Sequence, residues 1–235
     1  MRALFSVAAV LVAAGAAQAA TISFASDTNP NGPTFNGISG GPPILLRDGG
    51  LPDPDGLVTV ALLVDADENG PGLPTVEEAG FFFDATLTGY SRTMVGTAWR
   101  HEWLASGTLM FHHHATGEML LGVEFANALM TSWSESQFDM GLSATLQWNA
   151  LVDPAPGPFD GTLTEQFGNT REFAFTLTNI RAFSELGPRV AVSSEGTFRD
   201  DWASEGSFSA TLVPTPGAMG LLGLGGLLAA RRRGR

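Results

Sequence analysis

Side chains that alternate between apolar and polar every two positions run through much of this chain and limit what it can fold into. In residues 171–180, one face of a strand would carry Phe173, Phe175, Leu177 and Asn179 and the other Ala174, Thr176, Thr178 and Ile180. Other strand-like segments are 21–25, 81–88, 92–99, 108–114, 119–125, 142–148, 190–198 and 206–213. Strand signals about ten residues apart, with Gly and Pro between them, are typical of antiparallel sheets. The sequence therefore predicts an all-β fold, either an antiparallel β-sandwich or a jelly-roll-like domain.

Three segments depart from this alternation. Residues 57–64 are apolar almost without interruption, which predicts a strand buried on both faces at the centre of a sheet. Residues 37–55 are rich in Gly and Pro and are expected to form a long loop. Residues 124–135 are the one stretch that could form a helix. Since β-sandwiches of about 200 residues often form single units, we expect one domain over residues 20–213.

The first residues are organised like a secretory signal peptide. Arg2 supplies a positive charge, an apolar run follows to residue 14, and residues 17–19 (Ala-Gln-Ala) form a small-x-small cleavage site. We therefore expect residues 1–19 to form a signal helix that Sec-type export machinery recognises. The chain has no cysteine, so an exported domain here would depend on its core rather than on disulfides.

The C-terminal segment combines a proline motif, a short apolar run and a basic end. Its parts are Pro214, Thr215 and Pro216, then residues 217–230, then Arg231, Arg232 and Arg233. As a helix, the apolar run would span about 21 Å, which is short of the roughly 30 Å of a bilayer core. Arginines beside an apolar segment stay in the cytoplasm. The segment therefore predicts a marginal membrane helix with a cytoplasmic basic stop and the body of the chain outside.

This order of parts resembles the PEP-CTERM sorting signal of exported bacterial proteins, with Thr215 in place of the usual Glu. The resemblance covers residues 213–235 only. It implies that an exosortase-like enzyme handles the tail, residues 214–235, and releases or attaches the body at the cell surface. The alternative is an uncleaved anchor that holds the protein in the inner membrane.

The charge balance excludes two classes of partner. The chain has 12 basic side chains, all of them arginine, and five of these lie in the two terminal segments. Residues 20–213 thus carry 7 basic side chains against all 24 acidic ones. Such a surface repels nucleic acid and anionic lipid headgroups, so we expect no partner of either kind. It suits an extracellular protein, or one that binds cations.

A calcium site is the most specific internal signal. In residues 65–70, side-chain oxygens of Asp65, Asp67 and Asn69 stand at alternate positions before Gly70, as at the start of a calcium-binding loop. Position 12 of such a loop is Val76 rather than Glu, so the segment is not an EF-hand. The alternatives are a weaker Ca²⁺ site at a strand end and a solvated acidic turn.

Histidines could form a second metal site. His112 and His114 would share one face of a strand, and His101 or Glu102 would have to complete the set from elsewhere. No His-Glu-x-x-His pair is present, because the motif that starts at His101 lacks its second histidine. Exposed or hydrogen-bonded histidines are the alternative.

The sequence gives no evident catalytic motif. There is no Gly-x-Ser-x-Gly segment and no cysteine, and a hydrolase would need two carboxylates or a histidine site in one cleft. Stacking of sugars on tryptophan is an alternative to core packing for Trp99, Trp103, Trp133, Trp148 and Trp202. We therefore expect a structural or adhesive protein of the cell surface or extracellular matrix without enzymatic activity. The alternatives are a calcium-dependent carbohydrate-binding module, whose partner would be a surface polysaccharide, and a secreted hydrolase.

Overall fold

The computed structural model describes residues 20–25, 35–39, 44–48, 58–65, 75–149, 162–163, 169–183 and 189–213. This part of the chain forms ten strands: β1 (Ala20–Ala25), β2 (Phe35–Ile38), β3 (Ile44–Asp48), β4 (Val58–Asp65), β5 (Thr75–Val95), β6 (Ala98–His113), β7 (Met119–Ser134), β8 (Ala144–Asn149), β9 (Asn169–Ala182) and β10 (Trp202–Val213). All pairings are antiparallel, so the predicted all-β class is confirmed. The expected signal helix and tail helix lie outside the described residues. Within those residues, no helix has the length and apolarity needed to cross a membrane.

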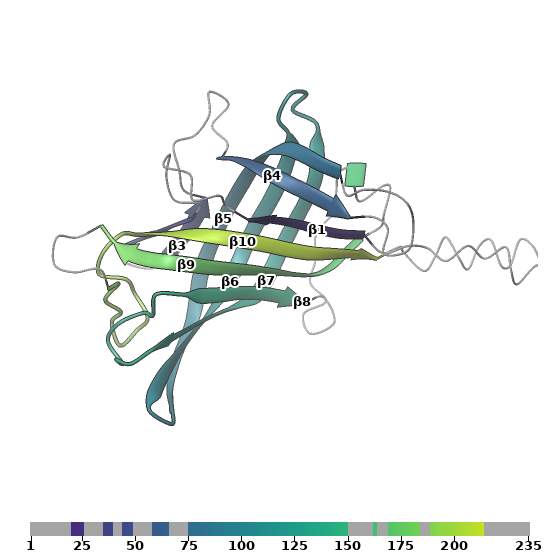
Figure 1. Ribbon diagram of the computed structural model, residues 1–235. Helices are drawn as coiled ribbons and strands as arrows, with labels where there is room; N and C mark the ends of the chain where they lie inside the picture. Colours follow the sequence, from purple (N-terminus) through teal and green to yellow (C-terminus); the bar gives the residue numbers. More distant parts are fainter. Residues whose placement is uncertain are drawn as a thin grey trace, which may run out of the picture.

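The ten strands form one sheet that closes on itself. Strands β5 to β10 pair in sequence order, and β10 returns to β5 by two routes. Residues 207–212 of β10 pair with β1, which leads through β4 to residues 75–81 of β5. Residues 202–204 of β10 pair with β2, which leads through β3 to residues 84–87 of β5. In Figure 1, β1, β8, β9 and β10 lie across the front of β5, β6 and β7, so the sheet has two layers, as in a β-sandwich.

Phenylalanine fills the space between the layers. Eight rings from both layers are no more than 3 % exposed: Phe24, Phe81, Phe83, Phe111, Phe125, Phe173, Phe175 and Phe208. Phe175 is near their centre, with its ring centroid 4.9 Å from that of Phe208 and 5.3 Å from that of Phe83. Tilted and edge-on ring pairs of this kind add to the stability gained from burial.

β-Bulges interrupt the alternation in three long strands. Register shifts occur in β5, β7 and β9 around Gly89, Asn127 and Asn179, which have φ angles of 54°, 51° and 52°. A bulge inserts one residue into a strand, so the residues before and after it face the core at positions of opposite parity. In β7, Phe125 and Val123 are buried before the bulge, and Ala128 and Met130 after it.

These bulges account for two incorrect expectations. Residues 124–135 belong to β7 and form no helix; the bulge at Asn127 spaces Phe125 and Ala128 by three positions, which imitates a helical period. Ile180 is buried on the same face as Leu177, rather than on the opposite face, because the bulge at Asn179 lies between them.

Four other segments also differ from expectation. Residues 58–65 form a strand with one buried face, since Thr59 and Ala61 are exposed. The expected loop at 37–55 contains β3 and part of β2, because short strands can pair despite neighbouring Gly and Pro. The expected strand at 92–99 is split by a turn at residues 96–97, where Gly96 takes a positive φ. Residues 190–198 make only isolated bridges, as their backbone turns back on itself at Gly196.

Three strands continue beyond the closed part of the sheet. We call residues 90–95 of β5, 98–103 of β6 and 133–134 of β7 the ribbon. The β5–β6 hairpin projects at the lower end of the molecule in Figure 1. Residues 135–143 and 189–201, which we call the cover segments, pack over its inner face and bond to each other, for example from Val192 N to Phe138 O at 2.7 Å. The rest of the sheet is called the body below.

Candidate functional site

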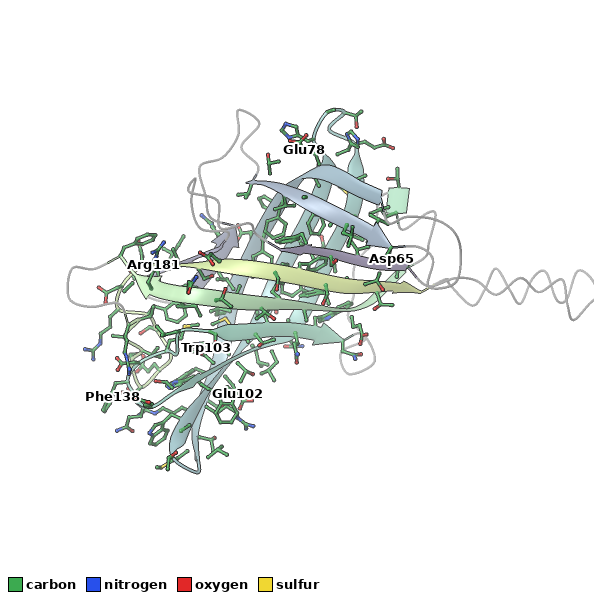
Figure 2. All side chains as sticks on the ribbon, viewed as in Figure 1. Asp65, Glu78, Glu102, Trp103, Phe138 and Arg181 are labelled. Carbon is green, nitrogen blue, oxygen red and sulfur yellow. The ribbon has the colours of Figure 1, made fainter. Side chains whose placement is uncertain are left out.

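The predicted calcium residues fall mostly outside the described residues. Asp65 is the last residue of β4, at the end of the molecule opposite the ribbon (Figure 2), whereas Asp67 and Asn69 lie outside. Within the described part of the chain, no group of three or more His, Asp or Glu side chains is placed to hold a metal ion. The calcium site therefore stays a prediction.

The histidines do not come together. His101 and His112 lie on the same strand, β6, and are separated by about 36 Å at the usual strand rise of about 3.3 Å per residue. His112 Nδ1 is 3.4 Å from Gly117 O, and His113 Nδ1 accepts a hydrogen bond from Ala115 N. His101 is fully buried and cannot complete a metal site with His112.

The five tryptophans form no common sugar-stacking surface. Trp103, Trp148 and Trp202 are buried and Trp99 is half-buried. Trp133 is 49 % exposed, so it is the tryptophan most accessible to a ligand.

On the inner face of the ribbon, a hydrogen-bonded network surrounds His101. Its Nε2 is 3.1 Å from Ser136 O, which can only accept, so Nε2 carries the proton. Nδ1 is then an acceptor, and Tyr90 donates its hydroxyl proton to it over 2.7 Å. The bulge at Gly89 brings Tyr90 to this face, because it shifts the alternation of β5 by one position. The arrangement fixes a neutral His101.

Burial controls the protonation of this network. It lowers the pKa of His101 below its ordinary value of 6.5; the hydrogen bond with Ser136 opposes this and the positive charge of Arg92 adds to it. The carboxylate of Asp139 also acts to raise it. Burial raises the pKa of Tyr90, and Arg92 acts in the opposite direction. His101 and Tyr90 are thus held in their neutral forms.

Aromatic packing helps to cover His101. The Trp103 ring lies 5.1 Å from Tyr90 and 5.6 Å from Phe198, and its Nε1 donates to Gly196 O over 2.9 Å. Gly196 has a φ of 85°, and a Cβ at this position would overlap the Tyr90 ring. The buried His101 side chain therefore has no route to a substrate and packs against Trp103, which belongs to the same hydrophobic core as the phenylalanine rings.

Large apolar side chains are exposed towards the ribbon end of the molecule. Eight large apolar side chains in the described residues are markedly exposed: Met94, Val95, Leu104, Leu129, Trp133, Phe138, Leu142 and Phe183. All lie towards the same end of the strands, where β5, β7 and β9 end and β6, β8 and β10 begin. Figure 2 shows Phe138 at this end and Asp65 at the other. Sequence reasoning missed this patch because its members are far apart in the chain.

A groove lies within this end, beside Trp133. It has a volume of about 240 Å³ and is lined by Trp133, Ser134, Glu135, Met140, Gly141, Leu142 and Arg189. Arg189 Nη2 is 3.8 Å from Glu135 Oε2, and both side chains are exposed. The guanidinium of Arg100 lies 6.0 Å from the Trp133 ring centroid and is paired with Glu102 at 3.1 Å. The groove thus combines an aromatic ring with hydrogen-bond donors and acceptors.

A second, larger groove lies over β8, β9 and β10. Its volume is about 430 Å³, and Gln147, Glu172 and Thr211 are among its lining residues. Trp148 contributes to its wall but is only 3 % exposed, so this groove offers little aromatic surface to a ligand.

Comparisons with known proteins find no relative. No protein-family model matches the chain, and neither a curated protein nor a solved structure matches it.

Proposed function

We propose that this chain is an exported structural or adhesive protein of the cell surface or extracellular matrix, without enzymatic activity. Two features of the sequence support export: the signal peptide expected at residues 1–19 and the sorting tail expected at 214–235. An exosortase-like enzyme would process this tail, whose motif is Pro214, Thr215 and Pro216. Between them stands an acidic antiparallel β domain of sandwich-like or jelly-roll-like form.

The observation that carries the adhesive role is the grouping of exposed apolar side chains at one end of the molecule. Elsewhere the sheet buries such side chains, as in the phenylalanine core. A protein surface that gathers Trp133, Phe138, Leu142 and their neighbours is typical of a binding surface. These side chains lie towards the end of the molecule from which the β5–β6 hairpin projects (Figure 1).

Intact-mass measurement of the protein recovered from its host tests this proposal. We expect the mass to lack residues 1–19 and the segment after about Pro216, with the protein in the surface or extracellular fraction. A mass that lacks only residues 1–19 would favour an uncleaved membrane anchor. Recovery of the full-length chain from the cytosol would overturn the proposal.

Carbohydrate binding is the second candidate function. The observation that favours it is the half-exposed Trp133 beside the Glu135–Arg189 pair. If calcium supports such binding through Asp65, Asp67 and Asn69, the thermal melting temperature will rise on addition of Ca²⁺ and fall with a chelator. Equal melting temperatures with Ca²⁺ and with a chelator would show that calcium has no part in this candidate function.

A further inference from the structure

We propose that the groove beside Trp133 binds one pyranose ring of an extracellular polysaccharide. This inference rests on the adhesive function proposed above and specifies its ligand and its site. Trp133 is one of the five tryptophans for which the sequence leaves sugar stacking open, but no local motif places it beside Arg189, since the groove combines the end of β7 with both cover segments.

Trp133 supplies the stacking surface. Half of this side chain is in contact with solvent, although large aromatic side chains gain most when they are covered. The C–H face of a pyranose is an apolar, flat partner for an indole ring. The Arg100 guanidinium near the ring is held by Glu102 and supports the position of the indole.

Glu135 and Arg189 supply the polar contacts. They are 3.8 Å apart, and their side chains are 90 % and 51 % exposed, so this ion pair contributes little by itself. Neighbouring hydroxyls of a sugar can donate to a carboxylate and accept from a guanidinium at the same time. The pair therefore matches a polyhydroxylated ligand better than a purely apolar one.

Hydrogen bonds and close packing fix the position of Gly141 in the wall of the groove. Ser132 Oγ accepts a hydrogen bond from Gly141 N over 3.0 Å and donates one to Ser143 O over 2.7 Å. A Cβ at Gly141 would overlap the carbonyl oxygen of Trp133, so only glycine allows this close approach. These contacts hold the cover segment against β7 before a ligand arrives, which reduces the entropy cost of binding.

The size of the groove selects a single ring. Its volume of about 240 Å³ lies below the range of about 300–1,000 Å³ that is usual for drug-sized ligands. The carboxylate of Glu135 at its rim disfavours an anionic lipid headgroup. A sugar unit within a polymer satisfies both constraints.

Affinity electrophoresis of the full-length chain in gels that contain a neutral β-glucan or a neutral mannan tests the proposal. We expect one of these polysaccharides to retard the protein, and the Trp133→Ala variant to bind it about tenfold more weakly. Glu135→Gln should weaken binding several-fold. The matched control is Phe138→Ala, which removes another exposed aromatic ring at the same end but outside the groove.

The outcomes separate the site from the function. If a polysaccharide retards the wild-type chain and the Trp133→Ala variant equally, the groove assignment is wrong, but polysaccharide adhesion remains possible at another place on the protein. An equal loss in Phe138→Ala indicates general apolar adsorption and also overturns it. The groove assignment is also overturned if the wild-type chain binds neither polymer. It is likewise overturned if sedimentation shows a dimer of the wild-type chain that the Trp133→Ala substitution abolishes. Export is decided independently by the mass measurement.

Discussion

The body and the ribbon bury aromatic side chains in different ways. In the body, phenylalanine rings pack against one another and contribute through burial, which has no preferred direction. In the ribbon, His101 and Trp103 are buried and Tyr90 is half-buried, and the three side chains make hydrogen bonds of 2.7, 3.1 and 2.9 Å. All four buried polar side chains among the described residues (His101, Ser132, Ser134 and Ser204) lie towards the ribbon end. The stability of the body therefore depends on filling the space between the layers. The stability of the ribbon depends on hydrogen-bond geometry and on the protonation state of His101.

Loss of a central ring in the body should have the largest effect. Phe175→Ala removes a fully buried side chain and should lower the free energy of unfolding by about 3–5 kcal/mol, as measured by urea denaturation. Phe183→Ala is the matched control, since Phe183 is 62 % exposed and should change stability by no more than about 0.5 kcal/mol. Equal unfolding midpoints for the two variants would contradict the role assigned to the phenylalanine core.

A methyl group at Gly196 should have the next largest effect, because it disturbs geometry in the ribbon. Gly196→Ala introduces both an unfavourable positive φ and an overlap with the Tyr90 ring, with an expected loss of about 2–4 kcal/mol. Gly117→Ala separates the two causes. Gly117 has a φ of 70° but open space around it, so the loss there should be only about 1–2 kcal/mol. If Gly196→Ala lowers the free energy of unfolding no more than Gly117→Ala does, the Tyr90 ring can move aside to accommodate the added methyl group.

Acid should weaken the ribbon, with the smallest effect of the three. The pKa of His101 is lower in the folded chain than its ordinary value of 6.5, so below about pH 6.5 the unfolded chain binds more protons. As the pH is lowered further, the free energy of unfolding should decrease by at most about 1.4 kcal/mol per pH unit for one proton. This decrease should end once His101 is protonated in the folded chain as well.

A double variant isolates this contribution. Tyr90→Phe combined with His101→Gln removes the titrating group and the hydroxyl that it accepts from. Urea denaturation between pH 5 and 7.5 should show a shallower pH dependence for this variant than for the wild-type chain. If the free energy of unfolding has the same slope against pH in the double variant and the wild type, His101 is not the source of the pH dependence.

The sequence predicts much of the fold because most strands obey a local pattern. Residues 171–180 alternate clearly, and β9 spans them. Closure of the sheet depends on partners that are distant in the chain, such as Ala20 with Leu212, and no local pattern encodes such a pair. The short strands β2 and β3 owe their conformation to β10 and β5 and lack a strong pattern of their own.

The candidate site was less predictable because bulges decide which side chains are exposed. Without the bulge at Asn127, Trp133 would share the inward face of β7 with Val123 and Phe125. The extra residue turns it outwards and turns Ala128 and Met130 inwards. Likewise, Tyr90 faces His101 only because of the bulge at Gly89. A single sequence offers little sign of either bulge, since Asn and Gly also occur at ordinary turn positions.

Closure of the sheet also determines when folding can finish. Strand β1 pairs with β4 on one side and with β10 on the other, so the first strand needs the last one. Contacts between such distant parts of a chain form slowly, because a large loop must close first. A chain that leaves the ribosome or passes through a translocation pore with its N-terminus first can complete this sheet only after residue 213 has emerged. Until then β1 has an open edge, and a chaperone or pore can hold the chain unfolded at little energetic cost.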